Sequence, residues 1–297
     1  MSMNGLIIVD KEQNMTSHDV CFKMKKILHE KTGHTGTLDP MATGVLIILV
    51  GKATRLAQYM TLDDKSYIAE LRFGLRSDTQ DIWGELEENG EFDFSEVQYD
   101  EVIKSYIGQQ KQLPPMYSAI KVDGRHLYDY ARKGKVVECE KRDITIHDIQ
   151  RLGENLPIEA KIKVDCSKGT YIRTLVNDIG ESLSCGAVMS GLNRVKTGDF
   201  TIAQAHKLSE VRDYAEQGKI SEILLPMDIA LTAYRRYDVN LESERIIKSG
   251  NELLEHNLIG EIDFQREDEL VRLYFDDEFI AIGRVRENSI KPVTVFI

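Results

Sequence analysis

The sequence is poor in the features that mark secreted, membrane-spanning and metal-binding proteins. Only four of its 297 residues are cysteines, and these are widely spaced with no Cys-x-x-Cys pair. Such usage is typical of a reducing compartment and disfavours a disulfide framework or a cysteine metal centre. No run of about 18 apolar residues predicts a transmembrane helix, and the N-terminus lacks the basic and apolar regions of a secretory signal. We therefore expect a cytoplasmic protein with no metal and no membrane association.

Known cofactor signatures are missing as well. The sequence contains no Gly-rich dinucleotide fingerprint, no phosphate-binding P-loop and no His-Glu-x-x-His zinc motif. It also has no internal repeat and no low-complexity segment. These absences disfavour nucleotide-dependent, redox and metal-dependent enzymes, and we expect no cofactor.

Positive charge is scarce. Lys and Arg number 38 against 49 Asp and Glu, and the net charge of -11 disfavours nucleic-acid binding because phosphate contacts need positive charge. The deficit is uneven, because the segment from Asp238 onward holds 14 acidic and 7 basic residues. Between Lys121 and Arg142 basic residues prevail and are interleaved with tyrosines. A local RNA-binding surface is therefore compatible with the composition.

Hydrophobic periodicity indicates an α+β protein. With 42% hydrophobic residues, the chain suits one large domain or a large domain with a small one. Strands are predicted over residues 4–10, 45–50, 65–73, 158–166, 186–195, 270–275, 279–286 and 292–296. Helices are predicted over residues 16–30 (with a capping box at Thr16 and Asp19), 52–60, 95–107, 125–133, 167–180 (after an initial glycine turn), 208–217 and 242–250. The pattern changes near residue 237, where a small β-rich module begins.

The segment with the sequence GHTGTLDPMATG, residues 33–44, is the most informative. Its three glycines allow backbone conformations closed to other residues, and Pro40 biases Asp39 toward an extended conformation. The apolar run at 45–50 follows and predicts a buried strand. The sequence therefore predicts a rigid loop that holds Asp39 and His34 at the edge of the core, where chemistry is commonly placed. On composition alone, Asp39 is more often a turn residue and His34 a structural histidine.

The full string GHTGTLDPMATGVL closely resembles the central motif of the TruB family of tRNA pseudouridine synthases, which convert a uridine of the T loop. Two further strings, MYSAIKVDGRHLYDYAR and CSKGTYIRTL, resemble the same family, and the resemblance covers most of residues 4–195. It implies a pseudouridine-synthase fold, which is a mixed, largely antiparallel sheet flanked by helices. It also implies a catalytic domain at 1–235 with an RNA-gripping insertion at about 112–145. By position, the module at 236–297 resembles the family's PUA domain, although its acidic excess departs from strong phosphate binding.

The resemblance also implies a catalytic site. Asp39 matches the catalytic aspartate, and Arg173 pairs with it, an arrangement that favours an ionised carboxylate. Tyr67 matches a tyrosine that stacks on the target base and is placed to take part in loss of the C5 proton. His34 fills the space that the extruded base leaves. From the residues alone, Tyr67 also fits core packing and Arg173 a solvated helix face.

Substrate-binding roles follow from the same resemblance. Tyr171 and Leu192 match pocket positions. Lys11 is a candidate neighbour of the active site, although a solvated strand end is the commoner fate of a lysine. Phosphate contacts to the T arm are expected from three basic residues of the insertion, Lys121, Arg125 and Arg132. Its tyrosines would stack on bases, and a charged helix with its aromatic residues in the core is the alternative.

Pseudouridine formation breaks the N1–C1′ bond, turns the uracil and joins C5 to C1′, so the reaction needs no redox cofactor or nucleotide. It needs an ionised carboxylate near the sugar and base, as in covalent glycoside chemistry. Whether Asp39 adds to C1′, adds to C6 or removes the C2′ proton stays open. The target uridine must first be extruded, which costs on the order of a few kcal/mol. We expect the uridine at position 55 of tRNA as substrate and no obligatory protein partner.

Two other function classes remain open. A non-catalytic RNA-binding protein would need the basic, tyrosine-rich insertion but neither Asp39 nor Arg173. A nucleosidase or glycosidase acting on small molecules would need a second catalytic carboxylate, for which the sequence offers no convincing candidate.

Overall fold

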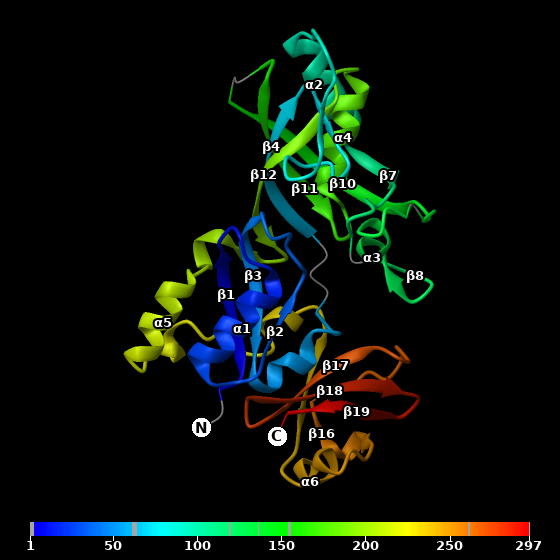
Figure 1. The fold of residues 1–297 in the computed structure, drawn as a ribbon. Coiled ribbons are helices and arrows are strands. Elements are labelled where there is room, and N and C mark those ends of the chain that lie inside the picture. The colour runs from blue at the N-terminus through cyan, green and yellow to red at the C-terminus, as the bar shows by residue number, and fades with distance from the viewer. Residues whose placement is uncertain are drawn as a thin grey trace.

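Figure 1 shows a lower half, with the strands at 5–11, 32–35 and 43–50, and an upper half, with the strands at 64–73, 108–112, 142–152 and 159–167. Strand β3 (Thr43–Val50) is the centre of the lower half. Its residues from Gly44 onward are buried, because strands pair with both of its edges and apolar side chains cover both of its faces. The apolar run that predicts a buried strand therefore forms one. The computed structural model describes residues 3–60, 64–118, 120–135, 137–153, 156–260 and 262–296, and Figure 1 shows how they are arranged.

A large sheet runs through both halves of the molecule. Its order is β1-β3-β12-β4-β11-β10-β7, with β2 beside β3 and β13 beside β12. Its strands are β1 (Gly5–Lys11), β2 (Thr32–Thr35), β3, β4 (Asp64–Phe73), β7 (Gly108–Gln112), β10 (Arg142–Leu152), β11 (Glu159–Ser167), β12 (Ala187–Thr197) and β13 (Phe200–Thr201). Neighbouring strands are antiparallel except β3 and β12, which are parallel. The expected mixed, largely antiparallel sheet is confirmed.

Strand β12 joins the two halves. It pairs with β3 through Asn193 and Arg194, and it pairs with β4 over most of its length. The backbones approach closely at this crossing: Gly44 has a φ of +100°, and a Cβ there would collide with the carbonyl oxygen of Arg194. The segment 36–42, which precedes β3, therefore lies where the upper and lower halves meet (Figure 1).

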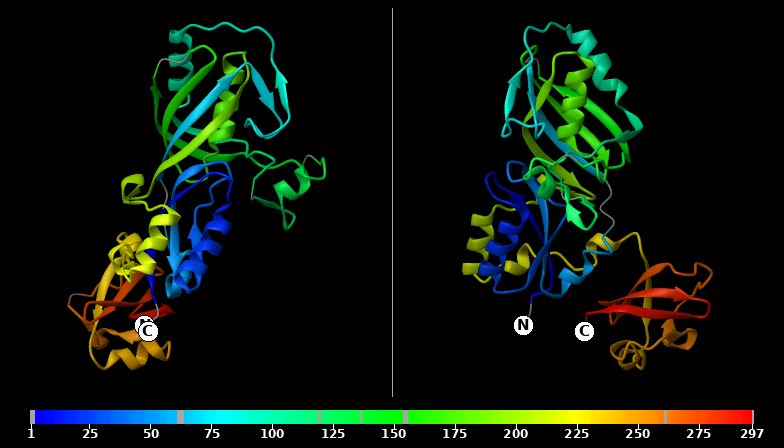
Figure 2. Two further views of the ribbon diagram at one scale, coloured as in Figure 1. Left: turned by 60° about the vertical axis from the view of Figure 1, so that its left-hand side comes forward. Right: turned by 45° about the vertical axis from the view of Figure 1, so that its right-hand side comes forward.

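Helices cover both halves of the sheet. Helices α1 (Ser17–Leu28) and α5 (Leu208–Glu216) pack on the lower half, and α2 (Glu96–Ser105) and α4 (Ile172–Ser182) pack on the upper half (Figures 1 and 2). The predicted capping box begins α1. Thr16 Oγ1 accepts a hydrogen bond from the backbone N–H of Asp19 at 3.0 Å, and the Asp19 carboxylate accepts one from the Thr16 N–H at 2.8 Å. The shorter helices are α3 (Leu127–Ala131), α6 (Ser243–Lys248) and the 3-10 turns η1 (Gly51–Leu56), η2 (Ile202–Gln204), η3 (Ile220–Glu222), η4 (Ile229–Leu231) and η5 (Glu255–Asn257).

A second sheet forms the C-terminal part of the chain. Its order is β15-β19-β18-β17-β14-β16. Its strands are β14 (Arg235–Val239), β15 (Leu253–Leu254), β16 (Leu258–Ile259), β17 (Leu270–Phe275), β18 (Glu278–Arg286) and β19 (Ser289–Val295). Phe296 and Ile282 pack into the same apolar cluster as Leu6 and Ile47, so this unit contacts the lower half directly. Strand β14 begins at the boundary predicted at 235/236. The division into domains there, and the PUA identity of the unit, stay predictions.

Tertiary pairing alters several predicted elements. The predicted helix at 52–60 is instead the 3-10 turn η1, which starts at Gly51 and ends at Leu56. The predicted loop at 33–44 begins as strand β2, because residues 32–35 hydrogen-bond to β3. The insertion contains a small hairpin of β8 (Lys121–Val122) and β9 (Arg125–His126), so the helix predicted to start at 125 starts at Leu127. A further hairpin joins β5 (Leu75–Ser77) and β6 (Leu86–Glu88). Strands β7, β10, β14, β15 and β16 were not predicted, because their pairing partners are distant in sequence.

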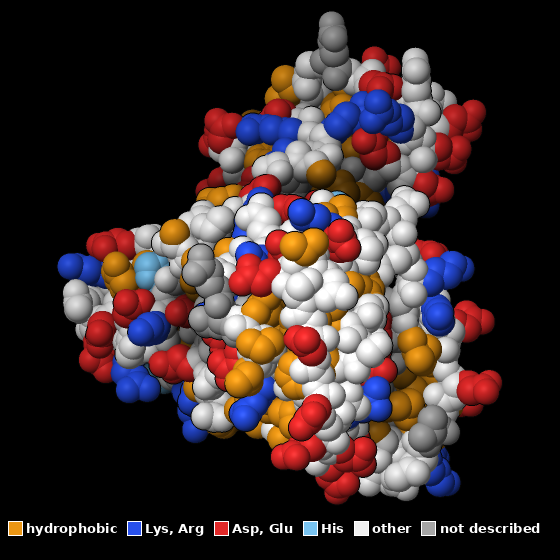
Figure 3. Space-filling model, turned by 90° about the horizontal axis from the view of Figure 1, so that it is seen from above, with side chains coloured by type: hydrophobic (Ala, Val, Ile, Leu, Met, Phe, Trp, Pro, Cys, Tyr) orange, Lys and Arg blue, Asp and Glu red, His pale blue; other side chains and the backbone are white. Residues whose placement is uncertain are grey.

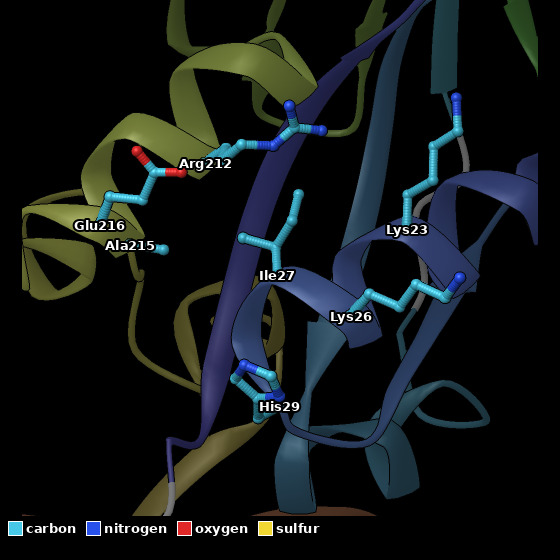
Figure 4. Close-up of a pocket in the computed structure, with 7 residues that line it drawn as sticks. All are labelled: Lys23, Lys26, Ile27, His29, Arg212, Ala215 and Glu216. Carbon is cyan, nitrogen blue, oxygen red and sulfur yellow. The ribbon is translucent and has the colours of Figure 1, made fainter.

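The face of the molecule seen from above shows no single dominant charge. Acidic and basic side chains are interspersed over the face seen from above (Figure 3). A hollow of about 530 Å³ lies between α1 and α5 (Figure 4), with Lys23, Lys26 and Arg212 among its lining residues. The ammonium groups of Lys23 and Lys26 point away from α5 there, so the basic groups do not converge on one point. In the described part of the chain, no helix is long and apolar enough to cross a membrane.

Candidate active site

Asp39 and Arg173 come from distant segments and meet where the two halves join. Asp39 lies between β2 and β3, in a turn closed by a hydrogen bond from the Ala42 N–H to the Asp39 carbonyl at 3.1 Å. Arg173 is the second residue of α4. Its Nε lies 3.1 Å from Asp39 Oδ2, and the arginine side chain is 7% exposed while that of Asp39 is 45% exposed. A buried guanidinium thus holds a carboxylate that faces open space.

The other nitrogens of Arg173 are also engaged. Nη1 donates to the carbonyl of Thr79 at 3.1 Å, and Nη2 donates to the carbonyl of Tyr117 at 2.9 Å. Because each nitrogen of the guanidinium has its own partner, the orientation of the group is fixed. A solvated helix face, the alternative for Arg173, is wrong.

A second carboxylate shares this arginine. Asp81 Oδ2 lies 3.5 Å from Arg173 Nη1, and its side chain is largely buried. Its other oxygen accepts hydrogen bonds from the Thr79 hydroxyl at 2.6 Å and from the Trp83 N–H at 3.1 Å. Asp81 ends the polar segment 76–81, whose sequence predicts only a loop. A carboxylate in a polar turn carries no local sign that it will reach a buried arginine.

Lys11 lies beneath the loop that carries Asp39. It is fully buried and donates hydrogen bonds from Nζ to the carbonyls of Pro40 at 3.1 Å, Met15 at 2.7 Å and Glu12 at 3.0 Å. Burial lowers the pKa of Lys11 to about 8, against an attraction to Asp39 that raises it. The alternative of a solvated strand end is therefore wrong. Lys11 acts on the backbone next to Asp39.

The Asp39 carboxylate faces a cleft with several adjoining hollows, and Arg173 lines each of them. A hollow of about 410 Å³ extends over Met41, Trp83 and Tyr128. A deeper pocket of about 110 Å³ and a hollow of about 360 Å³ on the side of α1 adjoin it. Aromatic and apolar walls with few charged groups are typical of sites that enclose a planar ligand.

Tyr67, Tyr171 and Leu192 line the deep pocket beside Asp39. Tyr67 is nearly buried on β4, and burial raises the pKa of its phenol. Tyr171 precedes α4, and its backbone N–H donates to Gln112 Oε1 at 2.8 Å. Burial raises its pKa too. Tyr67 packs in the core and also reaches the pocket, so the two readings of this residue are compatible.

His34 lies on β2 at the α1 side of the cleft, where it lines the same hollow as Asp39 and Tyr128. It is half-buried, and its Nδ1 has no hydrogen-bond partner within the described residues. Burial, and secondarily the charge of Arg194, lower the pKa of His34. The ring is therefore neutral at neutral pH.

The insertion projects from the junction of the two halves (Figure 2). Arg132 lines the cleft, with its guanidinium 5.4 Å from the centre of the Tyr128 ring. Lys121 and Arg125 lie exposed on the β8–β9 hairpin. Leu127 is the fully buried residue of α3, whereas Tyr128 is only half-buried. A charged helix with its aromatic residues in the core is therefore wrong for this segment.

The described residues contain no group of three His, Cys, Asp or Glu side chains placed to hold a metal ion. The chemistry that the cleft offers on its own is that of one open carboxylate, fixed by a buried arginine, next to a small pocket with a phenol. This suits the covalent or proton-transfer chemistry of a ribosyl–base bond.

Comparisons with known proteins agree with this chemistry. Residues 24–172 match the model for TruB family pseudouridylate synthase (N terminal domain), and residues 173–232 match the tRNA pseudouridylate synthase B C-terminal domain. The chain is 42% identical to tRNA pseudouridine synthase B of Clostridium tetani, over 99% of this chain and 100% of that protein. It is 41% identical to tRNA pseudouridine synthase B of Clostridium kluyveri, with the same coverage.

Solved structures give the same answer for the fold. A chain of a Cbf5-Nop10-Gar1 complex matches with a TM-score of 0.72 and 27% identity, over 99% of this chain and 84% of that one. A chain of an H/ACA RNP bound to a substrate RNA containing 2′-deoxyuridine matches with a TM-score of 0.72 and 25% identity, over 99% of this chain and 85% of that one. With both family models matched and relatives above 40% identity over nearly the whole length, the chain belongs to the TruB family of pseudouridylate synthases.

Proposed function

We propose that this chain converts the uridine at position 55, in the T loop of tRNA, to pseudouridine, with Asp39 as the catalytic carboxylate. As a member of its family, the chain is an isomerase that forms pseudouridine from uridine in tRNA. The position in tRNA and the roles of individual residues are our proposals. The observation that carries the residue roles is the Asp39–Arg173 pair at 3.1 Å, open to an aromatic cleft, and the position in tRNA rests on the resemblance of the sequence motifs to the family.

Arg173 prepares Asp39 for the reaction. Its contacts to two carbonyls and to Asp81 fix the direction of Nε, which contacts the Asp39 carboxylate. The carboxylate is thus held in one place before the substrate arrives, which lowers the entropic part of the barrier. Addition to C1′, addition to C6 and removal of the C2′ proton all remain compatible with this placement.

Tyr67 is proposed to meet the uracil ring. Tyr67 and Leu192 both line the deep pocket beside Asp39, so a base inserted there contacts apolar surface and the phenol. After C5 has bonded to C1′, its proton must leave to restore the C5=C6 double bond. We propose that Tyr67, which lines the pocket beside Asp39, accepts it.

Binding is proposed to extrude the base. His34, neutral and at the mouth of the cleft, fills the space that the base leaves. Arg132 and Tyr128 offer a cation and a ring to the T arm, and Lys121 and Arg125 add phosphate contacts further out. We assign the catalytic part to 1–235 and a PUA-like unit to 236–297. A tRNA substrate agrees with the cytoplasmic location that the cysteine usage predicts.

The substrate assignment is tested by locating the product. Unmodified tRNA labelled with tritium at C5 of uridine releases tritium when pseudouridine forms. We expect release of one tritium per tRNA, and none from tRNA in which cytidine replaces the uridine at position 55. Undiminished release from that altered tRNA would refute the proposed position, and no release from either tRNA would refute tRNA as the substrate.

A further inference from the structure

Arg194 on β12 is buried, and none of the described residues gives it an acidic partner. It is 1% exposed. Its Nε donates to the carbonyl of Val45 at 2.8 Å, and its Nη2 donates to the carbonyl of Gly36 at 2.8 Å. Within the described ranges it forms no ion pair with a carboxylate. Burying a charge without a countercharge costs free energy, so packing alone does not account for an arginine here.

The two carbonyls flank the segment that carries Asp39. Gly36 lies before Asp39, and Val45 is the third residue of β3. Lys11 holds the carbonyl of Pro40 between them. Two buried cations, Lys11 and Arg194, therefore hold the Asp39 turn by hydrogen bonds to three backbone carbonyls. Neither cation bonds directly to the Asp39 carboxylate.

Tyr67 lies directly opposite Arg194 on the neighbouring strand β4, and its phenol lies close enough to the guanidinium for the two groups to interact. A guanidinium has only donors. In a hydrogen bond between the two groups the phenol oxygen must therefore be the acceptor, which leaves its own proton free to point elsewhere. The same contact favours the ionised phenol, against the burial that disfavours it.

We propose that Arg194 is a positioning residue of the isomerisation: it ties down the Asp39 turn and holds the Tyr67 oxygen as an acceptor facing the deep pocket. This rests on the proposed function, in which Tyr67 receives the C5 proton. At that step the phenolate takes the proton from C5, and the C5–H electron pair forms the C5=C6 bond. The C6=N1 pair moves to N1, which takes a proton from solvent, and Tyr67 later returns its proton to solvent.

The charges around Tyr67 set the direction of the pH effect. Arg194 of β12 favours the phenolate, whereas Asp39 and Cys166 of β11 disfavour it. Lys11 of β1 and His34 of β2 approach Arg194 from the lower half, and Arg173 and Tyr171 line the same pocket. Removing the charge of Arg194 therefore raises the pKa of Tyr67, and the pH-dependent rise in rate moves to higher pH.

Arg194→Gln and Arg194→Lys test the proposal, with Lys196→Gln as control because Lys196 is exposed on the same strand. Single-turnover tritium release is measured from pH 6 to 10 together with thermal unfolding and RNA affinity. We expect the Gln variant to bind RNA normally, to react about tenfold more slowly for each unit by which the pKa rises, and to show its pH profile displaced to higher pH. The Lys variant should recover most of the rate and the wild-type profile.

The outcomes distinguish a failure of the Arg194 proposal from a failure of the proposed function. A folded Gln variant with the wild-type rate and profile overturns it, and so do Gln and Lys variants that are equally slow with an undisplaced profile. If the Gln variant fails to fold, the Lys variant decides: a wild-type profile supports the proposal, and a loss of rate with an undisplaced profile overturns it. A wild-type enzyme that acts on a different tRNA uridine refutes the proposed position, and the same variants are then compared on that uridine.

Discussion

Replacing Arg173 by methionine removes the group on which the active-site geometry depends most. Its guanidinium contacts two carbonyls and two carboxylates from three different segments. A hydrogen bond from a charged donor contributes at least about 1.5 kcal/mol to the free energy of unfolding. The two carbonyl contacts therefore contribute about 3 kcal/mol. The Asp39 pair adds only about 0.5 kcal/mol because that carboxylate is 45% exposed. Together with the more buried Asp81, the expected loss is about 4 kcal/mol.

For a chain of this size, that loss lowers the Tm by about 10 °C. The rate should fall further than stability suggests, by about 100-fold or more, since an unanchored carboxylate loses its preset orientation. Arg173→Lys keeps the charge but cannot reach all four partners, so both effects should be intermediate. The control is Arg212→Met, which removes an exposed arginine from α5.

Thermal unfolding and single-turnover tritium release measure the two effects separately. The reasoning predicts a lowered Tm and rate for Arg173→Met and no change beyond about 0.5 kcal/mol for Arg212→Met. An Arg173→Met enzyme with the Tm and the rate of the wild type would refute the structural account of this pair.

Three further predictions concern the surroundings of the pair. His34→Ala should slow the reaction on folded tRNA but not on a short RNA whose uridine is already unstacked; equal slowing on both, measured by tritium release, would exclude a role in extrusion. Because the pKa of Lys11 is about 8 in the folded chain, the unfolded chain binds more protons between about pH 8 and 10.5, and Lys11 makes stability rise with pH over that window. In urea unfolding, the free energy of unfolding of Lys11→Met should not show this rise with pH. If it rises with pH as steeply as in the wild type, that result would contradict the burial of a charged Lys11. Arg132→Ala should weaken RNA binding more than Lys121→Ala, since only Arg132 lines the cleft, and equal losses in filter binding at several salt concentrations would contradict that ranking.

Much of the catalytic centre was accessible from the sequence, because its strings match a family motif. Asp39 and Arg173 lie in two such strings, and the structure brings them within 3.1 Å. The strands at 65–73 and 158–166 were predicted by alternation and are present as β4 and β11. Alternation predicts such strands correctly because each strand has an apolar face of its own.

The rest depended on long-range pairing. Lys11 has the local appearance of a solvated lysine, and only the placement of Pro40 above β1 makes it buried. Arg194 gains its role from the register of β12 against β4, which sets it opposite Tyr67. Strand β14 pairs with β17 in parallel, so no turn signal marks the pair. A single sequence shows none of these registers.

The most direct test of the central claim is Asp39→Asn, compared with Asp213→Asn, which changes an exposed carboxylate on α5. The chain's single tryptophan, Trp83, lines the cleft, so its fluorescence reports RNA binding without a label. The account predicts that Asp39→Asn binds tRNA with wild-type affinity and releases no tritium from C5-labelled tRNA, while Asp213→Asn behaves as the wild type. Measurable tritium release by Asp39→Asn would contradict it.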